Sequence, residues 1–571
     1  TPCGTLFPYT TLFRSRTITG QIESMAQKFI AGEDAASALP GLEKLWKRGV
    51  AFSVDLLGEA CVSDAEADAY RDKYLDLVKN LPERVAGWPG NDRLERDHLG
   101  AIPRVNVSVK VTSLSARLDP IDPEGAMADC MERLVPILEE AGRRGAFINF
   151  DMEQFALKDL TMSLFERCGE TVDFEGGIAL QAYLKSGDAD ARRVAEWARR
   201  TGKVVTVRLV KGAYWDYETI HAEQMGWPCP VWNTKPETDA CFERMTEVLL
   251  DATPRSEGEG GVKLALGSHN ARSIARGLAG LERRGLPREA IELQMLHGMA
   301  DQLKAAAAEM GLRVREYVPV GEMIPGMAYL VRRLLENTSN ESWLKAGFLD
   351  NADAETLLAD PVELIERAKR GGDDPGRNGS ANGSASGNGS AGGLVGGGPA
   401  RDLCELAPER HRLSPAVEGV GDGRPFATEP LRDFADGGQR DAFERAIRAA
   451  SVPEAPNTST AADADRALGE ASAAFGAWRD ADPVRRARVL TRAARALRER
   501  RDEISGVVIK ENGKGWVDAD ADVTEAIDFM EYYARHAPGL FRPERLGRYI
   551  GELNEQWHQP RGVAAVISPW N

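Results

Sequence analysis

A group of cationic and aromatic residues lies at the end of the apolar run KVVTVRLV at 203–210 and directly after it. Arginine and lysine side chains can hold phosphates or the electron-rich edge of a ring. Aromatic side chains can cover a planar ring system, and glycine lets a ligand approach the backbone closely. The segment therefore favours a site for a large, flat, anionic cofactor, with a buried strand ending in an ordinary loop as the alternative. The residues are Arg208, Lys211, Gly212, Tyr214, Trp215 and Asp216.

Polar side chains also end the other apolar runs between 45 and 350. A single polar residue in such a place is usually just solvated, but its repetition from run to run favours one shared site. The candidates are Lys110, Asp151, Glu153, Gln181, Tyr183, Arg208, Lys211, Ser268, His269, Asn270, Gln294, His297, Gly298 and Tyr317.

A helix is predicted over 326–338, where Tyr329, Arg332, Arg333 and Glu336 are spaced to share one face. Adjacent arginines can hold a carboxylate through bidentate hydrogen bonds. A solvated charged helix face is the alternative interpretation.

Eight strand-like runs alternate with amphipathic helical segments, which predicts a (β/α)8 barrel. An open doubly wound sheet is the competing architecture. Active sites of such barrels lie at the carboxyl ends of the strands, where the polar candidates fall. The predicted strands are 50–57, 104–112, 146–151, 177–183, 203–210, 262–268, 290–296 and 312–320.

The composition predicts several further segments around the barrel. The first residues read as non-native sequence or as a genuine arm, and 371–400 is rich in Gly, Ser and Asn, as flexible linkers are. The chain after 425 is predicted to hold helices and a final strand, GVAAVIS, and its end directly after that run suggests a fragment. The predicted divisions are 1–15 (non-native or disordered), 16–44 (helical arm), 45–350 (barrel), 351–424 (linker region) and 425–571 (second domain).

Charge and motifs exclude several classes of protein. The net charge of −16 argues against nucleic-acid binding. The seven cysteines form no CxxC pair, which suits a reducing cytoplasm, and no apolar run reaches the roughly 18 residues of a membrane span. No GxGxxG follows a predicted strand and no P-loop is visible. The histidines have no metal-binding spacing, so we expect a metal-free site.

The stretches INFDMEQ, IALQAYLK, VRLVKGAYWDYE, ELQMLHGM and YLVRRLLENTSN resemble the proline dehydrogenase domain of the proline utilisation A family. Together with similar stretches they cover about 45–350 in order. The resemblance implies a (β/α)8 barrel that holds FAD, oxidises L-proline to Δ1-pyrroline-5-carboxylate and passes electrons to a membrane quinone. The cysteine pattern predicts a cytoplasmic protein, and since no anchor is visible, membrane contact is expected only as peripheral.

The resemblance also implies roles for individual residues. Arg332 and Arg333 would hold the proline carboxylate with help from Lys110, and Tyr317 and Tyr329 would wall the substrate ring.

Two further residues complete the implied catalytic group. Asp151 would sit beside Lys110 and orient it, and Arg208 would lie near the reactive edge of the flavin. The implied FAD contacts are Asp151, Gln181, Arg208, Val210, Lys211, Gly212, Ala213, Tyr214, Trp215, His269, Asn270, Gln294, Leu296 and Glu336, with Thr234, Lys235 and Thr238 on the adenosine side.

The region after the linker resembles the start of an aldehyde dehydrogenase, in which Asn571 would hold the aldehyde oxygen. The full-length protein would oxidise glutamate semialdehyde with NAD, and we expect the present chain to lack that activity. Long members of the family begin with a DNA-binding segment, but no basic cluster precedes residue 45, so no nucleic-acid partner is expected.

Two other functions compete with proline oxidation. The barrel could oxidise another imino acid such as hydroxyproline, although the bulk of Tyr329 favours proline. The chain could also be a binding or assembly module without enzymatic activity.

Overall fold

The computed structural model describes residues 29–58, 60–322, 326, 329, 331–332, 354–370, 418–423, 425–454 and 458–567. The chain divides into two compact units: the first comprises Thr1–Ala222 and Cys229–Val395, and the second comprises Glu223–Pro228 and Gly396–Asn571. The predicted segment 1–15 and the Gly/Ser-rich stretch 371–400 lie outside the described residues.

Eight parallel strands close into a barrel in the order β1-β10-β9-β8-β7-β6-β5-β4. Each coincides with one of the eight predicted strands, so the (β/α)8 prediction is confirmed and the open sheet is excluded. The strands are β1 (Ala51–Leu56), β4 (Asn106–Val109), β5 (Phe147–Phe150), β6 (Gly176–Gln181), β7 (Val204–Val210), β8 (Gly261–Gly267), β9 (Ile291–Leu296) and β10 (Val314–Val320).

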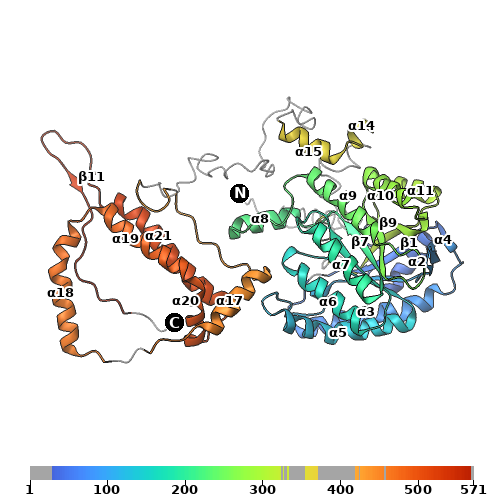
Figure 1. The fold of residues 1–571 in the computed structure, drawn as a ribbon, viewed down its shortest axis with the longest axis horizontal. Coiled ribbons are helices and arrows are strands. Elements are labelled where there is room, and N and C mark those ends of the chain that lie inside the picture. The colour runs from blue at the N-terminus through green and yellow to red at the C-terminus, as the bar shows by residue number, and fades with distance from the viewer. Residues whose placement is uncertain are drawn as a thin grey trace, which may run out of the picture. The chain divides into compact units, whose positions relative to one another are not determined.

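Helices surround the strands (Figure 1). Strand β7 shows how the sequence produces this arrangement, because successive side chains of a strand point to opposite faces. Val205, Val207 and Leu209 are buried in the layer between strands and helices, whereas Thr206 and Arg208 face the barrel interior. The helices are α3 (Asp64–Val85), α5 (Pro123–Arg144), α6 (Lys158–Thr171), α7 (Gly187–Thr201), α8 (Trp215–Met225), α9 (Lys235–Asp251), α10 (Ala271–Arg284) and α11 (Asp301–Glu309).

The barrel domain includes elements that the predicted divisions placed outside it. Helix α2 (Ala35–Lys47) buries Leu42, Leu45 and Trp46 in the same core as the strands. Helices α14 (Ala354–Leu357) and α15 (Pro361–Lys369) lie within the predicted linker region, where Arg272 of α10 binds the Leu358 carbonyl at 2.6 Å and Asp360 at 3.0 Å.

The amino-terminal end of the barrel carries a short helix and a hairpin. These are α4 (Asp92–Glu95) and the antiparallel strands β2 (Arg96–Asp97) and β3 (Gly100–Ala101).

The second unit is mainly helical, and α19 and α21 run side by side (Figure 1). The predicted final strand is wrong for its described part, because residues 562–567 are not in a strand and their Val566 and Ile567 side chains are exposed. A strand requires a hydrogen-bonded neighbour, and the described residues offer none there. The elements are α17 (Gly437–Ala449), α18 (Ala461–Arg479), α19 (Pro483–Glu499), α20 (Arg501–Asn512), α21 (Trp516–Leu540), β11 (Glu544–Arg545) and β12 (Glu555–Gln556). Among the helices of the described residues, none is both long and apolar enough to cross a membrane.

Candidate active site

Arg208 lies at the centre of the site, with only 5% of its surface exposed. Its Nη1 donates to Asp151 Oδ1 at 2.6 Å, and its Nε donates to Gln294 Oε1 at 2.6 Å. Its Nη2 donates to the hydroxyls of Ser53 and Ser108 at 3.2 and 3.0 Å. Arg208 of β7 is thus bonded to side chains of β1, β4 and β9 and to the residue after β5, which fixes a positive charge inside the barrel.

Asp151 connects Arg208 to Tyr317 at the carboxyl end of the barrel. The Tyr317 hydroxyl donates to Asp151 Oδ2 at 2.7 Å, and the Arg208 guanidinium lies 5.0 Å from the centre of the Tyr317 ring. Burial and the nearby carboxylates of Asp151 and Asp55 hold the pKa of Tyr317 well above its usual range. Tyr317 is therefore a neutral hydrogen-bond donor at any physiological pH.

Lys110 pairs with a residue that the sequence analysis did not single out. Its ammonium forms an ion pair with Asp55 and donates to the Leu56 carbonyl at 3.1 Å. The expectation that Asp151 orients Lys110 is wrong in this respect, because the oxygens of Asp151 accept from Arg208 and Tyr317 instead. Asp55 is nearer because β1 pairs directly with β4, which places Asp55 beside Ser108, two residues before Lys110.

The described part of the predicted 326–338 helix brings two expected substrate residues to the same end of the barrel. Tyr329 is buried in a cluster with Leu57 and Met299, against which Tyr317 and Leu296 pack. The Arg332 guanidinium lies 5.0 Å from the centre of the Tyr214 ring, so the helix meets the loop after β7. Arg333 and Glu336 lie outside the described residues.

Two lysines share one carboxylate at the expected dinucleotide site. Lys211 forms an ion pair with Asp239 of α9, and Lys235 Nζ binds the other oxygen of Asp239 at 2.8 Å. Burial lowers the pKa of Lys211 in spite of Asp239. The three side chains leave an excess of one positive charge when both lysines are protonated, which suits a phosphate group.

The loop after β7 is packed by aromatic side chains. Tyr183 is buried with Leu184 and Val231, and Tyr214 and Trp215 pack against them. Trp215 Nε1 donates to the Trp232 carbonyl at 2.7 Å. The orientation of the Trp215 indole is therefore fixed by a hydrogen bond to a backbone carbonyl.

Gly212 has a positive φ of 134°, and a Cβ built on it would lie 2.4 Å from Cγ of Tyr183. The glycine is thus required for the close approach of the Tyr183 ring, and its contact with a ligand stays a prediction. Its neighbours Val210 and Ala213 are half-buried and exposed, respectively.

Replacing Gly212 by alanine tests this packing. We expect Gly212→Ala to lower the free energy of unfolding by about 2–5 kcal/mol, from backbone strain plus overlap with Tyr183. Gly100→Ala is the matched control, because Gly100 has φ of 133° but nothing within 4 Å of the built Cβ. Urea unfolding of both variants measures the difference, and equal losses would show that the Tyr183 contact contributes nothing.

Several other predicted FAD contacts have defined local partners. Gln181 donates to the Glu153 carbonyl at 3.0 Å, while its Oε1 is buried without a hydrogen-bond partner among the described residues. His269 Nε2 accepts from the Leu296 amide at 3.1 Å, which places the ring proton on Nδ1. Asn270 caps α10 by accepting from the amides of Arg272 and Ser273 at 2.9 and 3.3 Å, so its amide nitrogen is the group left to donate.

The residues predicted to contact the adenosine lie at the start of α9. The Thr234 hydroxyl donates to Glu237 Oε2 at 3.0 Å, and Thr238 is buried. Gln294, predicted to line the flavin, donates to Glu292 at 2.8 Å and accepts from Arg208.

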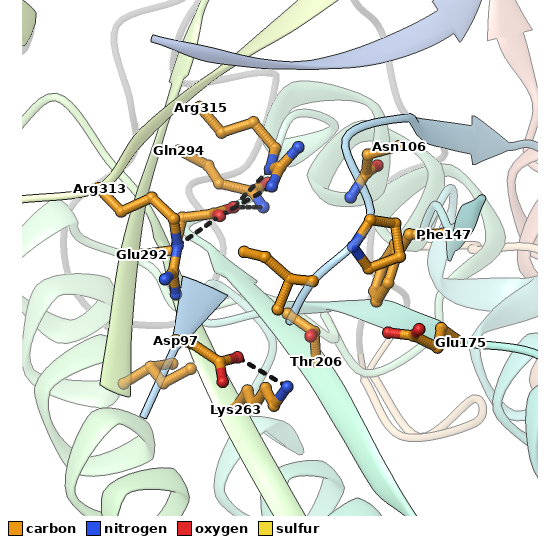
Figure 2. A pocket seen from close by; sticks show the side chains of 13 residues that line it. Asp97, Asn106, Phe147, Glu175, Thr206, Lys263, Glu292, Gln294, Arg313 and Arg315 are labelled. Atoms are coloured by element: carbon orange, nitrogen blue, oxygen red, sulfur yellow. Dashed lines mark hydrogen bonds and ion pairs between the residues drawn. The ribbon is translucent and has the colours of Figure 1, made fainter. Parts of the chain in front are cut away.

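The cavity drawn in Figure 2 lies at the opposite, amino-terminal end of the barrel. It encloses about 50 Å³ and is lined by residues from the starts of the strands, enough for one or two water molecules. Glu292 binds Arg313 at 3.0 Å and Arg315 at 2.7 Å, and Lys263 binds Asp97 of the hairpin at 2.7 Å. These ion pairs belong to the structural end of the barrel, because barrel enzymes act at the other end.

The fold and site therefore define a (β/α)8 barrel with a buried, charged site at the carboxyl ends of its strands. A family model described as proline dehydrogenase matches residues 38–346, and one described as the aldehyde dehydrogenase family matches residues 444–571. Since the first match covers more than half of the chain, the chain belongs to the proline dehydrogenase family.

Curated relatives and solved structures agree with this assignment. The chain is 27% identical to bifunctional protein PutA of Salmonella typhimurium and 28% identical to that of Escherichia coli, covering 96% of this chain and 40% of each relative. The structure of PutA from Bdellovibrio bacteriovorus inactivated by N-propargylglycine matches with a TM-score of 0.81 and 36% identity, over 98% of this chain and 57% of that one. The chain is thus PutA-like, with part of an aldehyde dehydrogenase half, and spans well under two thirds of these relatives.

The sequence analysis missed four residues that the structure places in the site: Ser53, Asp55, Ser108 and Asp239. A signal for three of them was present, because Ser53, Asp55 and Ser108 are polar residues at alternate positions of otherwise apolar strands. In a closed barrel this spacing indicates side chains that face the interior.

Proposed function

We propose that the chain is a flavoenzyme that oxidises L-proline to Δ1-pyrroline-5-carboxylate and passes the electrons to a quinone. The observation that carries the proposal is the family match over the whole barrel, with the cations and phenols of the motifs gathered at one end of it. The site residues and the cofactor named below are part of the proposal. Peripheral contact with the cytoplasmic face of a membrane would give access to the quinone.

The residues present suit FAD. The buried Gln181 Oε1, which has no hydrogen-bond partner within the described part of the chain, is an acceptor that a ring N–H of the flavin can satisfy. The excess positive charge of Lys211 and Lys235 over Asp239 suits the pyrophosphate. When bound, FAD would supply the two-electron acceptor that no protein side chain provides.

The protein would supply binding, orientation and electrostatics. Arg332 would hold the proline carboxylate together with Lys110, and Arg333, outside the described residues, is proposed as the second arginine. Tyr317 and Tyr329 would enclose the ring and exclude water. The fixed guanidinium of Arg208 would stabilise negative charge that develops close to it.

An anaerobic visible spectrum before and after addition of L-proline tests the function. We expect a yellow protein whose flavin absorbance disappears with L-proline and persists with D-proline, the control ligand. Absorbance that persists with L-proline would contradict the substrate, and a colourless purified protein would contradict the cofactor. A hydroxyproline rate equal to that of proline would favour the broader imino-acid oxidase.

The aldehyde dehydrogenase match suggests a second reaction in a longer protein. The aldehyde dehydrogenase family model covers residues 444–571, and the 1-pyrroline-5-carboxylate dehydrogenase 2 of Bacillus subtilis is 47% identical to this chain over 108 residues, which are 21% of that protein. We propose that this region belongs to a half that oxidises glutamate semialdehyde with NAD, the hydrolysed product of the first reaction.

A further inference from the structure

We propose that Asp55 is a positioning residue of the substrate site, which holds the Lys110 ammonium charged and in place for the carboxylate of the substrate. This inference rests on the proposed function, because it assigns a role to Asp55 in binding the same imino acid. It extends the site to a residue that no motif in the sequence pointed to.

The strand geometry directs Asp55 into the barrel. Asp55 and Ser53 are two residues apart on β1, so their side chains share one face. Ser53 Oγ donates to Asn106 Oδ1 at 2.6 Å and accepts from Arg208 at 3.2 Å, which identifies that face as the interior. Asp55 is completely buried, and its carboxylate pairs with Lys110.

Among the residues that the structure describes, the partners of Lys110 leave one of its donors available for a ligand. An ammonium group has three N–H donors, and Asp55 and the Leu56 carbonyl accept two of them. The lysine stem, otherwise a flexible chain, is thereby fixed before the substrate arrives. The third N–H is the one that a substrate carboxylate can accept.

Asp151 cannot replace Asp55 in this role. Asp151 Oδ1 accepts from Arg208 and Asn149, and Oδ2 accepts from Tyr317. Within the described part of the chain, Asp55 Oδ2 is buried and accepts no hydrogen bond. Lys110 is therefore the cation that compensates the negative charge of the Asp55 carboxylate.

The charges around Lys110 explain why its protonation would depend on Asp55. Burial alone would lower the pKa of Lys110, but Asp55 chiefly, with Tyr74 and Asp151, raises it above the usual value for lysine. The titratable and charged groups that face it are Asp55 from β1, Tyr70 and Tyr74 from α3, Asp151 and Glu153 after β5, Arg208 from β7 and Tyr317 from β10. Without the Asp55 charge, the largest contribution that opposes burial is lost, so the ammonium loses its proton at a lower pH.

Binding of cyclopentanecarboxylate to the full chain tests the proposal by calorimetry. This probe has the carboxylate and ring of the substrate but no nitrogen to oxidise, so its binding does not depend on turnover. We expect Asp55→Asn to weaken binding at least tenfold and to move the pH at which binding is lost to a lower value. Lys110→Met should weaken binding equally, and the double variant should show no further loss, since the two residues act as a unit.

Two further variants complete the test. Asp55→Glu retains the negative charge but displaces the Lys110 ammonium. Binding should therefore weaken, while the pH at which binding is lost should stay at the wild-type value. This variant decides the matter if Asp55→Asn does not fold. Glu43→Gln, which removes an exposed carboxylate paired with Lys47, is the control and should bind like wild type.

Unchanged binding in Asp55→Asn at every pH, unchanged binding in Asp55→Glu, or additive losses in the double variant would each overturn the proposal. If the wild-type chain binds the probe but proline does not reduce its flavin, the proposed function is refuted. Probe binding by the variants still tests the role of Asp55 in that case. A wild-type chain that does not bind the probe would contradict both.

Discussion

Replacing Arg208 by methionine is expected to have the largest effect on the barrel. The variant leaves the buried carboxylate of Asp151 without its cation and removes the N–H groups that Arg208 donates to Gln294, Ser53 and Ser108. Removing one partner of a buried ion pair typically lowers stability by about 3–5 kcal/mol. We expect a loss of that size in urea unfolding, followed by tryptophan fluorescence, and a fall in the rate of flavin reduction by proline of at least about 100-fold.

Two variants separate the causes of this effect. Arg208→Lys keeps a positive charge but cannot reach all four acceptors, because lysine presents a single compact ammonium. It should retain part of the stability and still reduce flavin slowly. Arg200→Met removes an exposed arginine paired with Glu170 at 3.3 Å and should change stability by no more than about 0.5 kcal/mol. An Arg208→Met variant as stable as this control would refute the assigned role.

The second large effect is expected at the opposite end of the barrel, at Glu292. Glu292→Gln would leave Arg313 and Arg315, both buried, without their carboxylate (Figure 2). We expect a loss of about 3–5 kcal/mol with a normal affinity for the carboxylate probe, since the proposed substrate site lies at the other end. Glu124→Gln is the matched control, because Glu124 makes two hydrogen bonds to Arg167 but is 72% exposed.

The pH dependence of this loss has a defined sign. Burial would raise the pKa of Glu292, but Arg315 and Arg313 lower it from 4.5 to about 2. A carboxyl whose pKa is lowered by folding stabilises the protein above its unfolded pKa and loses that contribution as pH falls toward the folded pKa. The stability gap between wild type and Glu292→Gln should therefore be constant above about pH 4.5 and shrink by up to about 3 kcal/mol toward pH 2. A gap that does not change with pH would contradict the ionised pair.

Much of the fold could be predicted because each of its strands and helices is determined by residues that are close together in the sequence. Each barrel strand is a short apolar run between helical segments. Strand β7 also shows the two-residue period of a strand, because Val205, Val207 and Leu209 stand at alternate positions. The end of the second unit could not be predicted in this way. The run at 562–567 has strand-like composition, but composition does not provide the neighbouring strand that a sheet requires.

The candidate site was predicted as a set of residues rather than as a set of contacts. Lys110, Asp151, Arg208 and Tyr317 all lie at the carboxyl end or in the interior of the barrel, as their positions in the strands require. The polar residues on β1 were missed, although Ser53 and Asp55 alternate with apolar neighbours.

By itself the sequence determined which residues enter the barrel, because the alternation of a strand and the position of its end are local properties. Only the tertiary structure decided which of them meet. Lys110 pairs with Asp55 because β1 is the hydrogen-bonded neighbour of β4, and Asp151 is thereby left to Arg208 and Tyr317. Such pairings depend on closure of the barrel, the register of its strands and the reach of each side chain, none of which is set by residues close together in the chain.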